Sequence, residues 1–231
     1  MSISDLKTLK RLLKSDLSAL PVVKVSLLGD TATQFLATAI RGIGVERGYN
    51  VDLYEAEYDQ VERQLLDPTS DLYEFNADFI VLFQSTHKLG EHHAMLSTEQ
   101  QATLAEDRLK FVTSVCSNPA LDGKKIICFN YPEIDDTVFG SYANRVPQSL
   151  TWQVRRLNCG LMDLSQQYPN LFICDIAALQ NKLGRNAMFA ANVYTSTEMV
   201  LSIDILPYVA SRVMDILCRE RTVQEMSHFG P

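Results

Sequence analysis

Short apolar runs alternate along the chain with longer segments in which apolar residues recur about every three to four positions. A short run bounded by turn residues is typical of a buried strand, and the longer period is typical of an amphipathic helix. The short runs predict five strands, at 22–28, 51–56, 77–83, 124–129 and 171–174. The periodic segments predict helices at 31–47, 99–115, 150–167 and 202–218.

The order of these elements predicts a fold class. Strand, helix and strand repeat at intervals of about 25–45 residues, which indicates parallel strands joined by right-handed crossovers. The run at 77–83 is almost entirely apolar, as expected for a strand that is covered on both faces. We therefore predict one α/β domain over residues 22–218, with a five-stranded parallel sheet in a three-layer, flavodoxin-like α/β/α arrangement.

Residues 1–21 form a separate amphipathic segment. Leucines recur there at helical spacing with Lys and Arg between them, and Pro21 ends the pattern. The stripe comprises Leu6, Leu9, Leu12, Leu13, Leu17 and Leu20. We expect a helix that packs on or flanks its own domain, while binding to a membrane surface or a homodimer seam remain alternatives.

Composition and charge exclude several classes of protein. With 46% apolar residues among 231, the chain can build a full core and does not resemble a disordered protein. It has neither a run of about 20 apolar residues nor a signal-peptide core, which argues against a membrane protein. The 28 acidic residues against 21 basic ones argue against nucleic acid as the ligand. Five scattered cysteines without a C-x-x-C pair predict neither disulfide nor zinc, so we expect a cytoplasmic protein.

Candidate functional residues follow from the predicted sheet, because ligands of such folds bind beyond the carboxyl ends of the strands. Polar or small residues follow each of the first four strands. They are Gly29, Asp30 and Thr31, then Asp59 and Gln60, then Ser85, Thr86 and His87, and finally Asn130. We predict that these residues line a binding cleft.

The turn Gly29-Asp30-Thr31 has two interpretations. Thr31 is placed at a helix N-terminus, where a hydroxyl can act as a nucleophile if a base is within reach. Alternatively, Asp30 or Thr31 simply caps the helix, as such residues do in most helices. The spacing of later glycines excludes a dinucleotide-binding fingerprint, and no P-loop motif is present.

Three of the four histidines fall in the predicted loop 86–93. His87, His92 and His93 lack fixed helical spacing, and Glu91 is the only carboxylate close by in sequence. We therefore predict solvated loop histidines and no metal site, with His87 nearest the cleft.

Two segments carry a resemblance to a known family. Residues 52–60 read DLYEAEYDQ, and residues 66–75 read LDPTSDLYEF. With the order of elements and the Gly-Asp-Thr turn, they resemble the N-terminal, SGNH-hydrolase-like domain of FkbH-like proteins of HAD-superfamily subfamily IIIC, over about residues 22–218. In that family a HAD-type phosphatase domain follows and holds magnesium. The resemblance thus implies that residues 219–231 lead as a linker to an absent HAD-like domain and that this domain itself holds no cofactor.

The same resemblance implies a degraded esterase site. The nucleophilic serine of SGNH hydrolases falls on Thr31, and the oxyanion-hole glycine falls on or near Asp59, whose carboxylate would repel an oxyanion. The family's asparagine after the third strand falls near His87. The catalytic Asp-x-x-His falls at about 196–199, where Met199 cannot serve as a base.

The sequence is compatible with three functions. The first is an accessory domain that positions an acyl carrier protein, or a tethered acyl or glyceryl group, for a HAD-type domain, since FkbH-like proteins are implied to load glycerate-type units onto carrier proteins. The second is a hydrolase or acyltransferase that uses Thr31 with Asp30 or His87. The third is a structural interaction domain. Whether the domain is an enzyme is therefore open at this stage.

Overall fold

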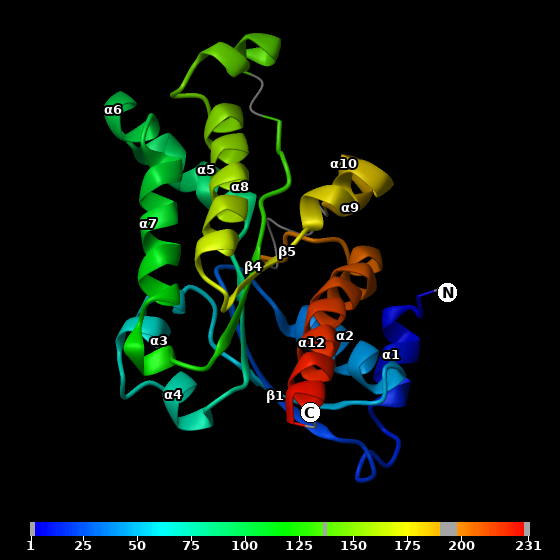
Figure 1. Ribbon diagram of the computed structural model, residues 1–231. Coiled ribbons are helices and arrows are strands. Elements are labelled where there is room, and N and C mark those ends of the chain that lie inside the picture. Colours follow the sequence, from blue (N-terminus) through cyan, green and yellow to red (C-terminus); the bar gives the residue numbers. More distant parts are fainter. Residues whose placement is uncertain (1–2, 136–137, 190–197, 229–231) are drawn as a thin grey trace.

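Five parallel strands form the central sheet of the computed structural model, which describes residues 3–135, 138–189 and 198–228 (Figure 1). The strands are β1 (Val22–Gly29), β2 (Asn50–Glu55), β3 (Phe79–Phe83), β4 (Lys125–Phe129) and β5 (Leu171–Cys174). Their order across the sheet is β2-β1-β3-β4-β5, which confirms the predicted α/β class. The connections reverse direction between β1 and β3, where doubly wound folds open a crevice for ligands.

Helices cover both faces of the sheet (Figure 1). One face carries α1 (Leu6–Leu12), α2 (Gln34–Glu46), α9 (Ile176–Leu183) and α12 (Leu206–His228). The other carries α3 (Val61–Leu66), α4 (Asp71–Phe75), α5 (Thr86–Met95), α7 (Leu104–Cys116) and α8 (Leu150–Gln167). Shorter elements are α6 (Thr98–Gln101), α10 (Arg185–Met188) and the 3-10 turns η1 (Pro119–Leu121), η2 (Gly140–Arg145) and η3 (Ile203–Ile205).

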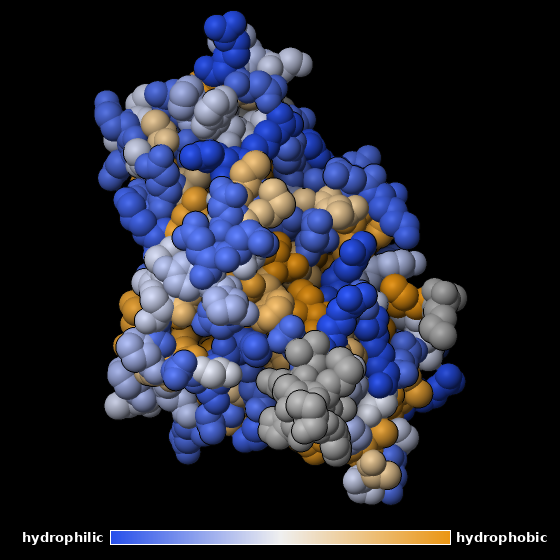
Figure 2. Space-filling model, viewed as in Figure 1, coloured by the Kyte–Doolittle hydropathy of each residue, from blue (hydrophilic) through white to orange (hydrophobic). Residues whose placement is uncertain are grey.

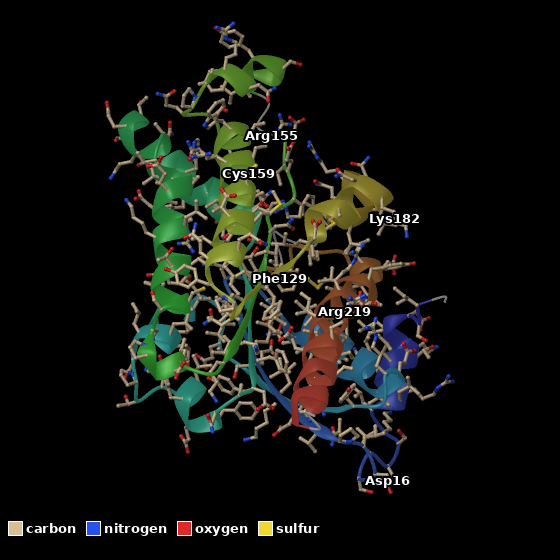
Figure 3. The ribbon with its side chains drawn as sticks, viewed as in Figure 1. Asp16, Phe129, Arg155, Cys159, Lys182 and Arg219 are labelled. Carbon is tan, nitrogen blue, oxygen red and sulfur yellow. The ribbon has the colours of Figure 1, made fainter. Side chains whose placement is uncertain are left out.

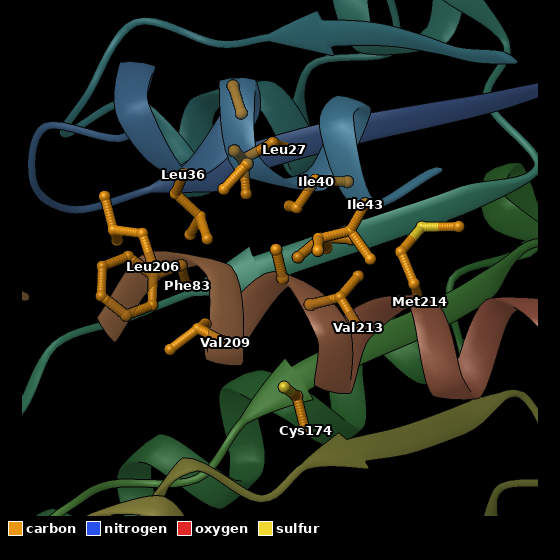
Figure 4. Close-up of a cluster of buried hydrophobic side chains, with 14 of the residues drawn as sticks. Leu27, Leu36, Ile40, Ile43, Phe83, Cys174, Leu206, Val209, Val213 and Met214 are labelled. Carbon is orange, nitrogen blue, oxygen red and sulfur yellow. The ribbon is translucent and has the colours of Figure 1, made fainter. Parts of the chain in front are cut away.

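Two apolar clusters, one on each side of the sheet, form the core. In the first, β1 presents Leu27 to Ile40 of α2 and Val213 of α12, as the close-up in Figure 4 shows. Phe83 and Phe129 meet edge to face in this cluster, with ring centroids 5.1 Å apart. Figure 3 places Phe129 in the middle of the molecule. The buried strands therefore contribute apolar side chains to both clusters, as the almost entirely apolar run at 77–83 predicted.

The N-terminal helix is shorter than predicted and packs on its own domain. Leu6 and Leu9 are buried, and a Cβ atom on Gly42 of α2 would lie 2.5 Å from the Leu9 Cβ, so the absence of a side chain there lets the helices approach. The helix ends at Leu12 instead of continuing to residue 20. The Ser15 hydroxyl donates to the Leu12 carbonyl at 2.6 Å, a local bond that competes with helix continuation.

Three further segments differ from the prediction. Residues 86–93, expected to be a loop, belong to α5, because Ser85 caps this helix by accepting a bond from the Lys88 N–H at 3.1 Å. The segment 61–75 contains α3 and α4, which the sequence pattern did not indicate. The last helix, predicted over 202–218, begins at Leu206 and runs to His228, across most of the segment expected as a linker.

Polar residues dominate the face shown in Figure 2, and an apolar strip crosses its centre over the β5 edge of the sheet. Phe172 and Ile173 of β5 are only partly buried at this edge. No helix in the described ranges combines the length and the apolar character that crossing a bilayer requires.

Candidate functional site

A cleft of about 540 Å³ opens beyond the carboxyl ends of β1, β3 and β4, at the predicted edge of the sheet. The segments that follow the strands contribute Asp30, Asp59, Gln84, Ser85 and Tyr131 to its wall. Helices α3, α5 and α7 supply the remainder, including the basic residues Arg63, Lys88 and Arg108. The cleft thus combines four carboxyl groups with hydroxyl groups, an amide group and cations.

In this cleft, burial favours the neutral, protonated form of Asp30. The Ser85 N–H donates to both of its carboxylate oxygens, at 3.0 and 2.8 Å. Burial raises the pKa of Asp30 from 3.8 to about 7, against the opposing effects of the Ser85 bond and of the positive charges on Arg108 and Lys88. Near neutral pH, Asp30 is therefore a mixture of acid and carboxylate and can donate or accept a proton.

Thr31, at the position of the SGNH nucleophile, does not face the cleft. Its side chain is fully buried, and its hydroxyl has no hydrogen-bond partner among the described residues. The neighbouring Ala32 N–H donates to the Glu198 carbonyl at 3.1 Å, so the segment that begins at Glu198 packs against this turn. Met199, at the position of the family's base, is buried as well. Within the described part of the chain, Thr31 is buried and does not line the cleft, and its catalytic role stays a prediction.

Thr31→Val tests this conclusion. Because an unpaired buried hydroxyl costs about 1–3 kcal/mol, we expect the variant to unfold at higher denaturant concentration, with hydrolysis of short p-nitrophenyl esters and thioesters unchanged. Ser26→Ala is the matched control, because the Ser26 hydroxyl is equally buried and unpartnered in the described structure but lies within β1. Loss of ester hydrolysis in Thr31→Val alone would instead identify Thr31 as a nucleophile.

The residues after β2 contribute to two pockets, and Asp59 lines both. Asp59 lines the cleft, and its N–H donates to the Gly29 carbonyl at 3.1 Å. It adopts a left-handed backbone with φ of 61°, which is uncommon for a residue other than glycine. Gln60 lies outside the cleft, in a neighbouring pocket of about 640 Å³. Gly29 also stays behind the cleft wall, where a Cβ would lie 2.5 Å from the Thr33 Cγ2.

Of the three residues predicted after β3, the structure brings Ser85 to the cleft and turns the other two to structural contacts. The Thr86 hydroxyl is buried and donates to the Pro132 carbonyl at 2.6 Å. The His87 ring packs edge-on against Phe189, with centroids 4.8 Å apart, and burial lowers its pKa. The prediction of a solvated loop histidine is therefore wrong for His87, because the segment is a helix that packs against the domain.

The other two histidines of α5 also differ from one another. The His93 Nε2 lies 2.7 Å from the Gln148 carbonyl, so this ring holds α5 to the segment before α8. His92 is exposed and lines the cleft. Among the described residues, no three His, Cys, Asp or Glu side chains gather where they could hold a metal ion.

Asn130, predicted to line the cleft, instead organises the start of α9. Its Oδ1 accepts bonds from the N–H groups of Ile176 and Ala177, at 2.8 and 3.0 Å. Its Nδ2 donates to the Asp175 carboxylate at 2.7 Å. These bonds satisfy N–H groups that a helix leaves open at its N-terminus. The adjacent residue, Tyr131, takes the place in the cleft.

Sequence reasoning missed the cleft residues that come from helices. Arg108 projects from α7 and pairs with Glu62 of α3 at 3.7 Å. Lys88 of α5 pairs with Glu198 at 3.1 Å. Tyr131 is buried, its hydroxyl lies 3.4 Å from the Gln84 Oε1, and burial raises its pKa above the usual range. Tyr131 could have been found from the strand-end rule, whereas no local signal marks a helix residue as part of a distant cleft.

Comparison with solved structures confirms the fold. The N-terminal part of the protein BF1531 from Bacteroides fragilis, containing a phosphatase domain and complexed with Mg, is 52% identical, with a TM-score of 0.89. That match covers 93% of this chain and 56% of the other, so the chain spans little more than half of that relative.

More distant matches share the fold alone. They include a lipase, Lip_vut3, from a goat rumen metagenome (11% identity, TM-score 0.57, covering 84% of this chain and 96% of the other). An acetyl xylan esterase, AlAXEase, is 13% identical with a TM-score of 0.54, covering 84% and 99%. The chain thus shares its overall architecture with a lipase and an esterase.

Comparison with curated proteins found no match. Residues 24–218, by contrast, match a family defined as the N-terminal domain of FkbH. This range includes β2 to β5, all of β1 except its first two residues, the cleft and the two segments, 52–60 and 66–75, that carried the resemblance. The chain therefore belongs to the FkbH N-terminal domain family.

Proposed function

We propose that this domain is a binding module of a larger protein, and that it positions an acyl carrier protein, or an acyl or glyceryl group tethered to one, for a phosphatase-type domain. In this proposal the domain holds its ligand without hydrolysing it. Any phosphate chemistry, with its magnesium, takes place in the other domain.

The observation that carries the proposal is an open cleft separated from the nucleophile position. The cleft retains about 540 Å³ at the edge of the sheet where this architecture binds ligands. Thr31 lies behind it, fully buried. A site with an open cleft and an inaccessible Thr31 hydroxyl is suited to binding more than to acyl transfer.

The relative from Bacteroides fragilis supports the link to a second domain. That protein carries a phosphatase domain, and the present chain covers 56% of it. Identity of 52% over 93% of this chain makes a similar partner domain the simplest expectation.

Titration with carrier proteins tests the proposal. We expect the chain to bind a holo carrier protein and to bind the apo form more weakly, because the tethered arm occupies the cleft. Met95→Asp, at the exposed rim of the cleft, is expected to weaken binding by about tenfold, since it places a charge against the arm. Met162→Asp is the matched control, because Met162 is an exposed methionine of α8 outside the cleft.

Absence of binding by either carrier form, both to this chain and to a full-length parent protein, would exclude this function. Equal weakening by Met95→Asp and Met162→Asp would place the carrier away from the cleft.

A further inference from the structure

Arg108 and Asp30 bring a cation and a carboxyl group with a high proton affinity to one cleft. The Arg108 side chain is 21% exposed, and its ion pair with Glu62 is long, at 3.7 Å. Glu62 is 63% exposed, so its carboxylate can exchange this pair for water at small cost. The guanidinium also contacts the Tyr131 hydroxyl and lies 5.0 Å from the centre of the Phe111 ring, but it carries five N–H donors, so it can still bind a stronger partner.

We propose that the cleft binds a small ligand through an oxyanion, a carboxylate or a phosphate monoester, held by Arg108 and Asp30. This inference rests on the proposed function, and it names the chemical group that the cleft recognises. Guanidinium pairs with such oxyanions through two parallel hydrogen bonds, which makes arginine the side chain best suited to this contact.

Anion binding also depends on the protonation state of Asp30. A carboxylate beside the anion would repel it, whereas the protonated acid donates a hydrogen bond to it. The pKa of Asp30, about 7 without ligand, makes the acid form accessible near neutral pH. Bound anion would raise this pKa further, so binding takes up a proton.

Other charged groups in the cleft act on this equilibrium in both directions. The Ser85 N–H and the positive charges of Arg108 and Lys88 favour the carboxylate form of Asp30. The cleft also contains Arg63 and His92, the acidic residues Asp59, Glu62 and Glu91, and the hydroxyl of Tyr131. Lys88 is paired with Glu91 and Glu198, at 3.4 and 3.1 Å, and its charge is therefore largely compensated. Two arginines remain. Arg63 is exposed and donates to the Gln60 Oε1 at 3.2 Å, whereas the Arg108 side chain is 21% exposed and is the less solvated of the two.

Calorimetric titration with three ligands of one carbon skeleton tests the inference. Glycerol is neutral, glycerate carries a carboxylate, and glycerol 3-phosphate carries a phosphate monoester. We expect at least one of the anions to bind at pH 6.5 and glycerol not to bind, and the stronger anion identifies which oxyanion the cleft prefers. Because a carboxyl such as that of glycerate has a pKa of about 4, its charge is constant across the range used. Where glycerate binds, its affinity should fall about tenfold per pH unit above pH 7.

Two variants separate the roles of the residues. Arg108→Gln is expected to lower anion affinity at least about tenfold, and Lys110→Gln, an exposed cation on the same helix, is the control that leaves it unchanged. Asp30→Asn keeps a donor but cannot ionise, so it should bind the anion with no pH dependence between pH 6 and 9. Because this variant is close in shape to the wild type, it carries the test if Arg108→Gln does not fold. With glycerol 3-phosphate, wild type and Asp30→Asn are compared at each pH, since the phosphate itself titrates near pH 6.

Equal binding of glycerol and the anions, absence of binding by both anions, or a pH dependence that persists in Asp30→Asn would overturn the inference. Carrier binding without anion binding would overturn this inference and leave the proposed function standing. Anion binding without carrier binding would do the reverse.

Discussion

Asp30→Asn is expected to stabilise the protein by about 2–4 kcal/mol at pH 8 and to leave its stability at pH 4 nearly unchanged. The folded protein holds the pKa of Asp30 at about 7, against an ordinary value of 3.8. This difference corresponds to about 4 kcal/mol at most. The expected stabilisation extends below this maximum because Asp30 is partly exposed, and solvent weakens the effect of burial.

The sign follows from which state keeps the proton. Between pH 3.8 and about 7 the unfolded chain loses the Asp30 proton while the folded protein keeps it. The stability of the wild type therefore falls as pH rises through this window, and the contribution is constant above it. Asparagine resembles the protonated acid at every pH, so the variant lacks this loss.

Urea unfolding at pH 4, 6 and 8 measures the effect. Asp204→Asn is the control, since Asp204 is exposed in η3 and its replacement should change stability by less than about 0.5 kcal/mol at each pH. A difference between wild type and Asp30→Asn that is the same at pH 4 and pH 8 would show that burial does not raise the pKa of Asp30.

Gln153→Leu is expected to destabilise the protein by about 3–5 kcal/mol, because it removes three hydrogen bonds of one buried side chain at once. The Gln153 Oε1 accepts from the Ala105 N–H at 2.8 Å. Its Nε2 donates to the carbonyls of Ala102 and Pro147, at 2.9 and 2.6 Å. The side chain is almost fully buried and ties α8 to the start of α7, the helix that carries Arg108. Leucine fills similar space but leaves these three backbone groups without a partner.

Chemical denaturation of Gln153→Leu and Gln166→Leu checks this prediction. Gln166 lies on the same helix but is exposed, so its replacement is expected to change stability by less than about 0.5 kcal/mol. A loss below about 1 kcal/mol in Gln153→Leu would mean that the three backbone groups find other partners or water.

The strands were predictable because each apolar run needs cover on both faces wherever it lies in the sheet. The run at 77–83, for instance, contains β3, whose five residues are all buried. The short helix α5 was not predicted, because its sequence lacks a clear apolar pattern. Its residues, from Thr86 to Met95, include three histidines and a glycine and show little apolar periodicity, and tertiary contacts such as His93 with Gln148 help to hold it.

The residues of the candidate site were likewise predicted only in part. The strand-end rule found Asp30, Asp59 and Ser85, because parallel strands bring their carboxyl ends to one edge whatever the details of packing. It also selected Asn130, which caps α9, since the rule does not tell which way a side chain turns. Arg108 came to the cleft through the packing of α7 on the sheet, and its neighbours in sequence contain no sign of it.

By itself, the sequence determined the α/β class, the order of strands along the chain and the edge of the sheet where the cleft opens, because these depend on local apolar pattern and short connections. Its two segments at 52–60 and 66–75 also pointed to the FkbH N-terminal domain family. Only the tertiary structure decided that Thr31 is buried away from the cleft and that burial raises the pKa of Asp30 to about 7. Both properties depend on how much water the assembled neighbours exclude, and desolvation is set by atoms far apart in the chain.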